Sequence, residues 1–303
     1  MTKFILINIL MAFIFAPLLM GIINRTKAFF AGRRGQPLLQ LYYDIYKLLN
    51  KSAVYSRTTT WIFRAGPVAG LSAVIMALLI IPYGTSRGLI SFDGDLILLC
   101  YLFGIARFFT VLAALDTGSS FEGMGAGREI QFAVLAEPAF LIALAALARE
   151  AGTISLSAVY SAFSPEMWAH NGPLLAFSAS AVFLVFLAEN SRVPVDDPNT
   201  HLELTMIHEV MALDHCGPDL AFILYGASLK FWVLGALFTG ILVNRWSANI
   251  WVNMFCFTAG MAALSVLTGM VESVMARLRM NNVPMMLVCA LAFSVLALLV
   301  QIR

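Results

Sequence analysis

The sequence predicts an all-α integral membrane protein with about eight transmembrane helices and one amphipathic cytoplasmic helix. Of its 303 residues, 60% are hydrophobic and 12% are charged, and the mean hydropathy of +0.86 lies far outside the range of soluble proteins. The apolar runs are about as long as one bilayer crossing, roughly 20 residues. No low-complexity linker separates them, so residues 1–303 are predicted to form a single polytopic membrane domain.

Polar segments separate the eight predicted spans. The spans are Thr2–Ile23 and residues 62–83, 95–115, 129–148, 173–189, 220–244, 250–272 and 283–302. No small-residue cleavage pattern precedes the basic residues Arg25 and Lys27, so the first span is expected to be retained rather than removed as a signal peptide.

The basic residues are distributed unevenly between the two sides of the membrane. If the spans alternate in direction, twelve fall on one side and five on the other. The twelve are Arg25, Lys27, Arg33, Arg34, Lys47, Lys51, Arg57, Arg64, Arg128, Arg192, Arg277 and Arg279. The positive-inside rule then predicts a multi-pass protein of the plasma (inner) membrane, with large cytoplasmic loops and both termini outside.

The first cytoplasmic segment contains the predicted amphipathic helix. Leu38, Leu41, Tyr42, Ile45, Leu48 and Leu49 recur at helical spacing, and Gln40, Asp44, Lys47 and Lys51 fall on the other face. Such a helix lies along the membrane interface, packs against a partner, or only orders the loop, and amphipathicity alone does not choose among these.

Two other connecting segments carry no signature of their own. Residues 116–129 are rich in glycine, but they lack a G-x-x-x-x-G-K-[ST] pattern and no strand precedes them, which argues against nucleotide binding. We expect a tight loop packed under other subunits. Arg149–Asn171 is expected to be a polar external loop.

The sequence offers no sign of a redox or metal centre. Cys100, Cys216, Cys256 and Cys289 include no C-x-x-C pair, so neither an iron-sulfur cluster nor a zinc site is expected in this chain. His201, His208 and His215 recur every seven residues, but that spacing is too wide for chelation by one helical face. Proton exchange or subunit contact is the favoured role of these histidines.

An unusual density of acids marks the segment between the fifth and sixth spans. Seven acidic residues fall within 31 positions: Glu189, Asp196, Asp197, Glu203, Glu209, Asp214 and Asp219. Crowded carboxyls beside a bilayer repel one another and lose hydration, so some are expected to have raised pKa values and to exchange protons near neutral pH.

Five ionisable residues lie in apolar surroundings within or at the ends of predicted spans. They are Arg107, Glu137, Glu189, Lys230 and Glu272. Each costs several kcal/mol in hydrocarbon unless it meets a partner or water. One interpretation is a set of buried ion pairs that fix helix register. The other is a hydrated relay from the acidic segment through Glu189 and Glu137 towards Lys230, in which Glu137 and Lys230 form one electrostatic unit flanked by Arg107 and Glu272.

Several motifs occur together along nearly the whole chain. They are Arg33-Arg34-Gly35 with Pro37, Leu39-Gln40, Asp44 and Lys47-Leu48; Ala106-Arg107-Phe108-Phe109 with Leu115-Asp116-Thr117-Gly118-Ser119; Arg128-Glu129; Glu137-Pro138; and Ser273 with Met275-Ala276-Arg277-Leu278-Arg279. In this order they resemble the membrane subunit of formate hydrogenlyase and hydrogenase-4 complexes, the group 4 Ni-Fe hydrogenases. That family is similar to the corresponding membrane subunit of NADH-quinone oxidoreductase, respiratory complex I.

That resemblance implies an eight-helix anchor that is a non-redox subunit with no active site of its own. Soluble Ni-Fe hydrogenase-like and iron-sulfur subunits would hold the cofactors on the cytoplasmic face, beside antiporter-like membrane subunits, and the assembly would couple redox chemistry to proton or sodium movement. Glu189, Arg192, Pro194, Asp196 and Glu203 match the family's acidic-loop motif. Asn199 and His201 replace usual glutamates, which leaves open a different coupling route.

These considerations define two sets of candidate residues. The predicted proton or ion pathway contains Glu137, Glu189, Glu203, Lys230, Arg107, Asp196, Glu209, Glu272, Glu129 and Asp116. The predicted subunit interface contains Arg33, Arg34, Asp44, Lys47, Arg128, Arg192, Arg277 and Arg279. No catalytic residue, metal ligand or nucleic-acid partner is predicted.

Two other functions remain open at this point. One is a quinone-linked subunit, whose chamber would lie among the first-loop helix, Arg33 and residues 189–219. The other is a stand-alone secondary transporter, which the lack of repeated broken helices disfavours.

Overall fold

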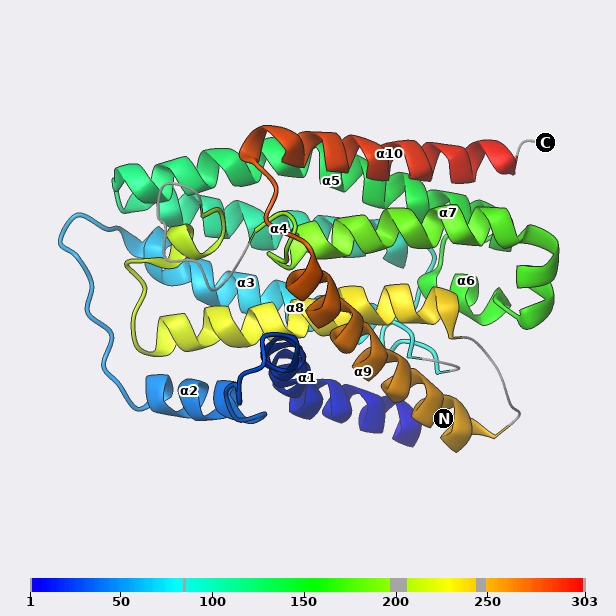
Figure 1. Cartoon of the computed structure of the whole chain (residues 1–303), viewed down its shortest axis with the longest axis horizontal. Coiled ribbons are helices and arrows are strands. Elements are labelled where there is room, and N and C mark those ends of the chain that lie inside the picture. The colour runs from blue at the N-terminus through cyan, green and yellow to red at the C-terminus, as the bar shows by residue number, and fades with distance from the viewer. Residues whose placement is uncertain (1, 84–85, 197–205, 244–248, 302–303) are drawn as a thin grey trace.

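The computed structural model describes residues 2–83, 86–196, 206–243 and 249–301, which form a bundle of long helices (Figure 1). These described ranges contain no β-strand and eight helices that are long and apolar enough to cross a membrane. The eight are α1 (Thr2–Phe30), α3 (Trp61–Ile80), α4 (Asp95–Asp116), α5 (Ser120–Ala151), α7 (Pro165–Glu189), α8 (Pro218–Leu242), α9 (Ile250–Val274) and α10 (Val283–Val300). The predicted all-α membrane fold is confirmed.

Helix α8 occupies the centre of the bundle. In an apolar stretch of 18 residues, 61% of α8 is buried inside the bundle, against 28% for the last span. Helix α8 packs against α1, α2, α3, α7 and α9. Phe231 of α8 and Phe186 of α7 are fully buried and their ring centroids lie 4.8 Å apart. A charge on α8 is therefore surrounded by other helices of the chain.

The predicted amphipathic helix is present as α2 (Gln40–Leu49), which has no buried residue. It packs beside α1 and α8, and the Tyr42 hydroxyl donates a hydrogen bond to the Ile14 carbonyl of α1. Figure 1 shows α2 next to the start of α8. Tyr43 and Tyr46 remain exposed on its outer side. The helix thus covers one end of the bundle.

Residues 120–129 are helical, so the tight glycine-rich loop expected there is wrong. The turn is confined to residues 117–119, and α5 runs on for 32 residues. Helical glycines cost up to about 1 kcal/mol each, but tertiary packing compensates. The buried Glu122 carboxylate accepts a hydrogen bond from the Asp214 amide (3.1 Å), and Gly125 faces Val210 of η1 (Glu209–Ala212).

Gly125→Ala should destabilise this contact because the added Cβ would meet Val210 and lie 2.9 Å from the Ile207 carbonyl oxygen. We expect a loss of about 1–3 kcal/mol, typical of overpacking. The matched control is Gly123→Ala, whose Cβ enters open space and should stabilise α5 by up to about 1 kcal/mol. Thermal unfolding of the purified protein measures both, and equal effects of the two substitutions would contradict the packing role of Gly125.

The predicted external loop Arg149–Asn171 contains more structure than expected. It includes α6 (Leu156–Ala162) and the first turns of α7. The fully buried Asp95 carboxylate accepts hydrogen bonds from the Leu156 amide (2.6 Å) and the Ser155 hydroxyl (3.1 Å). The Tyr160 hydroxyl donates to the Leu237 carbonyl (2.9 Å). These bonds hold α6 against the ends of α4 and α8.

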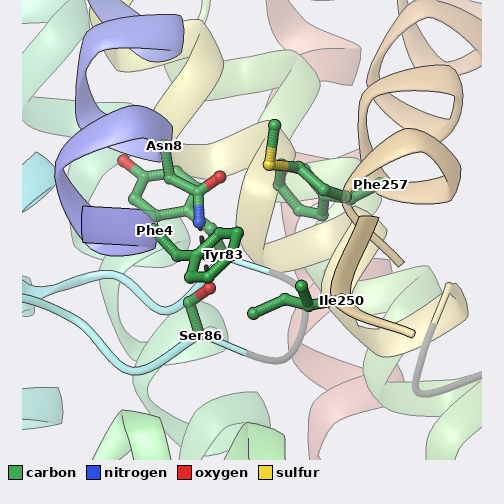
Figure 2. Close-up of a pocket in the computed structure, with 7 residues that line it drawn as sticks. Phe4, Asn8, Tyr83, Ser86, Ile250 and Phe257 are labelled. Atoms are coloured by element: carbon green, nitrogen blue, oxygen red, sulfur yellow. Dashed lines mark hydrogen bonds between the residues drawn. The ribbon is translucent and has the colours of Figure 1, made fainter. Parts of the chain in front are cut away.

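A small pocket lies beside the N-terminal end of α1 (Figure 2). Phe4 and Asn8 of α1 face Ile250 and Phe257 of α9, and the Asn8 amide donates to the Ser86 hydroxyl (3.0 Å). The space is about 10 Å³, enough for about one water molecule. It is a packing gap between helices.

Candidate functional site

Arg107 of α4 is the hub of a buried cluster of charges. Its side chain is 9% exposed and binds carboxylates from two other helices. Nε lies 2.9 Å from Glu129 Oε1, Nη1 binds Glu137, and Nη2 binds Glu189. Glu129 and Glu137 are two turns apart on α5, and Glu189 is the last residue of α7. One guanidinium thus joins three membrane helices.

Glu189 connects this hub to the central helix. Its Oε1 binds Arg107 and its Oε2 lies 2.7 Å from Lys230 Nζ of α8. The predicted unit of Glu137 with Lys230 is therefore wrong as a direct pair, because Glu137 binds Arg107 and Lys230 binds Glu189. The physical reason is helix placement: α5 packs against α4, α7 and α10, whereas α8 packs against α1, α2, α3, α7 and α9.

A second branch runs from Glu129 to the polar segment after α7. His208 Nε2 lies 3.1 Å from Glu129 Oε2, and its Nδ1 lies 3.5 Å from Asp196 Oδ2. Asp196 also accepts hydrogen bonds from the amides of Ile207 (3.1 Å) and His208 (3.2 Å), and its Oδ1 lies 2.9 Å from Arg277 Nη2. His208 thus bridges a membrane helix and the loop.

The electrostatics of this branch favour charged partners. Burial works to lower the pKa of His208, but the carboxylates of Glu129 and Asp196 raise it to about 9. Burial works to raise the pKa of Asp196, but contact with His208 and the charge of Arg277 lower it below its ordinary value. Asp196 is therefore not one of the acids with a raised pKa that the sequence led us to expect in this segment, because the neighbouring cations outweigh crowding.

Glu272 forms a separate cluster with two cations. Its side chain is fully buried, Oε2 lies 2.8 Å from Lys27 Nζ of α1, and Oε1 lies 3.3 Å from Arg192 Nη1. The Arg192 guanidinium lies 5.6 Å from the centre of the Phe231 ring. This cluster ties α1 and α9 to the segment after α7, so Glu272 pairs with Lys27 and Arg192 instead of flanking Glu137 and Lys230 as expected.

The Arg107 hub and Arg192 of the second cluster line one large cavity of about 720 Å³. Arg107, Glu189 and Lys230 contribute charges to its wall, Gln40 and Leu41 of α2 close one side, and α3 and α8 supply apolar surface. The volume falls within the range of small-molecule sites, about 300–1,000 Å³. The cavity therefore gives water or a ligand access to the buried charges.

The remaining predicted pathway residues are less closely connected. Glu209 lines the cavity and is exposed. The Asp116 carboxylate accepts hydrogen bonds from the Thr60 amide (2.6 Å) and hydroxyl (2.9 Å) at the start of α3, so the structure does not bring it into the cluster. Glu203 lies outside the described residues.

The predicted interface residues divide into two groups. Arg33, Arg34, Lys47 and Arg279 are exposed. The others make contacts within the chain: Asp44 with Gln40, Arg128 with the Met206 carbonyl, Arg192 with Glu272 and Arg277 with Asp196. The placement of Arg192 on a partner surface is corrected, since its side chain is buried in the Glu272 cluster.

Sequence reasoning left two members of these clusters, Lys27 and His208, out of both candidate sets. Lys27 was assigned only to the basic side of the membrane, although α1 continues to Phe30 and carries it to Glu272. His208 was assigned only to proton exchange or subunit contact. The signal that could have marked it is the presence of a titratable imidazole within the acid-rich segment.

These features define a class of protein: a multi-pass membrane protein in which buried charges link a polar loop to the interior of a helix bundle. The sequence profile of the NADH dehydrogenase family matches residues 2–302, and the chain belongs to this family.

Three similar proteins illustrate the relationship. The chain is 32% identical to formate hydrogenlyase subunit 4 of Escherichia coli (strain K12), with 96% of each protein covered. It is 31% identical to hydrogenase-4 component C of the same strain, over 75% of this chain and 70% of that protein. A chain of the membrane-bound sulfane sulfur reductase, an archaeal respiratory membrane complex, shares its fold with a TM-score of 0.80 at 21% identity, covering 97% of this chain and 98% of that one. The resemblance to the formate hydrogenlyase and hydrogenase-4 proteins is confirmed.

Proposed function

We propose that this chain is a non-redox, ion-conducting anchor subunit of a membrane-bound hydrogenase-type oxidoreductase complex. Its similarity to a subunit of formate hydrogenlyase over 96% of its length supports this assignment. In this proposal, Ni-Fe and iron-sulfur centres belong to soluble partners on the cytoplasmic face, and electrons do not pass through this chain. Antiporter-like membrane subunits lie beside it, and the moving ion is a proton or sodium.

One observation carries the proposal: the buried ionic contacts form an unbroken series. Its members, in order, are Arg277, Asp196, His208, Glu129, Arg107, Glu189 and Lys230. No link in the series exceeds 3.5 Å. Carboxylates and an imidazole can accept and release protons, whereas the guanidinium of Arg107 stays charged and fixes their positions. The series leads from the polar loop to the central helix.

Glu137 provides a second exit from the hub. Its side chain is 53% exposed on the outer side of α5, in the middle of a span. A charge that faces hydrocarbon costs several kcal/mol, so a polar neighbour is expected there. We place a membrane partner subunit against this part of α5, where it would receive ions by way of Glu137, which Arg107 holds in position.

Glu189→Gln should lower ion movement by about tenfold or more while the complex still assembles. Glutamine keeps the shape and one acceptor oxygen, but it loses the charge, the second acceptor and the exchangeable proton. Proton or sodium uptake by vesicles containing the purified complex measures the effect. The matched control is Glu166→Gln at the exposed start of the same helix, which should leave uptake unchanged. Normal uptake in Glu189→Gln would refute the proposed route.

A quinone-linked role is the second candidate, and the 720 Å³ cavity favours it. Its wall combines α2 with residues 206–215, as that alternative requires, although Arg33 does not contribute. The two candidates differ in their electron partner. A purified complex supplied with hydrogen or with a quinone as alternative partners separates them: quinone-dependent turnover supports the second candidate, and hydrogen turnover without quinone supports the first.

We also propose that the end of the bundle with α2 and η1 faces the cytoplasm, following the excess of basic residues on that side. Cysteine introduced at position 40 or 203 should resist an impermeant thiol reagent in intact cells. Labelling from outside would reverse the topology, and with it the side on which soluble partners bind.

A further inference from the structure

Arg192 brings an unused hydrogen-bond donor to the wall of the large cavity. The residue is 8% exposed and lines the cavity. Its Nη1 lies 3.3 Å from Glu272 and its Nη2 contacts the sulfur of Met20, whereas Nε has no hydrogen-bond partner among the described residues. Glu272 also binds Lys27, so one carboxylate serves two cations. A buried charged donor without an acceptor is costly, so we expect an acceptor in the cavity beside Nε.

Two amide side chains border the same part of the cavity. Asn24 of α1 lines the cavity one turn after the methionine that contacts Arg192. The segment before α2 crosses α1 closely, because a Cβ on Gly21 would clash with the Leu38 carbonyl. Gln36 belongs to that segment and also lines the cavity. One cation and two amides thus border this side of the cavity, and such donors suit an anionic oxygen.

Much of the remaining cavity wall is apolar. Helices α3 and α8 pack against each other and contribute Leu71, Val74, Leu220 and Ile223 to it. Gly70 of α3 also lines the cavity, and a Cβ at this position would meet no atom within 4 Å. An inorganic anion bound at Arg192 would leave most of the 720 Å³ unfilled. An anion that carries a hydrocarbon chain would also cover the apolar wall.

Other charged groups of the cavity are less suitable for an anion. Arg107 and Lys230 are each paired with buried carboxylates. Asp44 and Glu209 line the cavity as well and would repel an anion from their part of the wall. Among the described residues, Arg192 is therefore the cation best placed to receive one.

We propose that the cavity binds an anionic amphiphile, a fatty acid or an anionic phospholipid. Its carboxylate or phosphate accepts from Arg192 Nε, Asn24 and Gln36, and its acyl chain lies along α3 and α8. The side-chain oxygen of Asn190, a buried atom of the same cavity without a partner among the described residues, accepts from a water that accompanies the anion. A quinone is neutral, so the charge of the headgroup distinguishes this ligand from the one that the second candidate function requires. The proposal does not depend on the ion route.

A matched pair of photoreactive probes tests the need for a negative charge. The purified complex is incubated with a long-chain fatty acid that carries a diazirine, or with the alcohol of the same chain. The acid should label the peptides that contain Leu71 or Ile223 about tenfold more than the alcohol does, because only its headgroup pairs with Arg192. Equal labelling by the two probes, or labelling confined to outward-facing residues, would overturn the proposal.

Lipid extraction identifies the natural ligand. The complex is washed with detergent to remove the surrounding lipid and is then denatured. About one anionic amphiphile per chain should be released, as expected for a single enclosed site. Mass spectrometry distinguishes a free carboxylic acid from a phosphodiester, and either supports the proposal. Release of quinone alone, of uncharged or zwitterionic lipid alone, or of no amphiphile would overturn it.

A substitution that fills the cavity provides an independent readout. Gly70→Phe should abolish labelling by the acid, because the added ring enters the open space beside α3. Gly104→Phe of α4 is the matched control. A Cβ at Gly104 likewise meets no atom within 4 Å, but this residue does not line the cavity, so labelling should persist. Equal labelling of the two variants would overturn the location of the site.

Substitutions of the donors test the headgroup contacts. Arg192→Gln should make the acid and the alcohol label equally, since the charge that selects the acid is lost. Arg192 also binds Glu272, so Asn24→Leu provides a second variant in which that contact remains. Asn24→Leu should reduce labelling by the acid and leave labelling by the alcohol unchanged. Wild-type preference for the acid in Asn24→Leu would overturn the assignment of the headgroup to this part of the cavity.

Discussion

Arg107→Met should abolish accumulation of the assembled complex and eliminate ion movement by any remainder. The substitution removes the partner shared by Glu129, Glu137 and Glu189. Breaking a buried ion pair by removing one member costs about 3–5 kcal/mol, which is a large fraction of the stability of a typical protein. Quantifying the chain in purified complexes, followed by thermal unfolding, measures the loss.

Three further variants distinguish the loss of the Arg107 ion pairs from the loss of any arginine charge. Arg64→Met is the matched control: Arg64 is exposed and lies over the Tyr55 ring at 4.2 Å, so its removal should change stability little. Arg107→Lys should be intermediate, because one ammonium lacks the planar fork that reaches three carboxylates. Combining Arg107→Met with Glu137→Gln should recover part of the yield, since fewer charges are then unpaired. Wild-type yield and uptake in Arg107→Met would show that the cluster is dispensable.

The eight spans could be predicted because hydropathy follows directly from the chain. Charged residues within those spans were equally visible, which is why Arg107, Glu189 and Lys230 were recognised. Their pairing was not predictable. Sequence position gives the depth of a residue in the membrane, but the direction in which its side chain points depends on which helices are neighbours, and α5 and α8 have different neighbours.

Helix ends were the weakest part of the sequence analysis. α1 continues to Phe30 through charged residues, and α5 begins at Ser120 in a glycine-rich stretch. Composition suggested that both stretches were loops. Charged residues are unfavourable within a membrane span, and glycine is unfavourable within a helix. Contacts distant in sequence decide otherwise: Lys27 binds Glu272, and Gly125 packs against Val210.

The loop residues of the candidate site required the folded structure. His208 reaches Glu129 only because Asp196 binds the backbone amides of Ile207 and His208 and fixes the turn. The cavity likewise depends on α2 lying across the bundle end. A seven-residue histidine spacing indicated that the segment was unusual, but it did not identify which histidine contacts a membrane helix.

His208→Gln should remove an alkaline transition in the stability of the protein. Its pKa rises from an ordinary value of 6.5 to about 9 in the folded state. The protonated imidazole therefore stabilises the folded state. This stabilisation is fully present below about pH 6.5 and is lost as the pH rises through about 9. The contribution is on the order of 3 kcal/mol at most. Folding has the opposite effect on Asp196, whose pKa is lowered. The stability that its carboxylate contributes is lost as the pH falls through its folded-state pKa.

Thermal unfolding of the purified complex between pH 6 and 10 tests this expectation. The wild type should lose stability as the pH approaches and passes 9, whereas His208→Gln should be less stable at pH 7 and show no such decline. Glutamine cannot carry the positive charge that His208 places between the carboxylates of Glu129 and Asp196. Each carboxylate keeps its arginine in the variant, Arg107 for Glu129 and Arg277 for Asp196. The control is His170→Gln, at an exposed position near the start of α7, which should retain the alkaline transition. If His208→Gln keeps that transition, the titrating group lies elsewhere and the imidazole does not connect the loop to the membrane cluster.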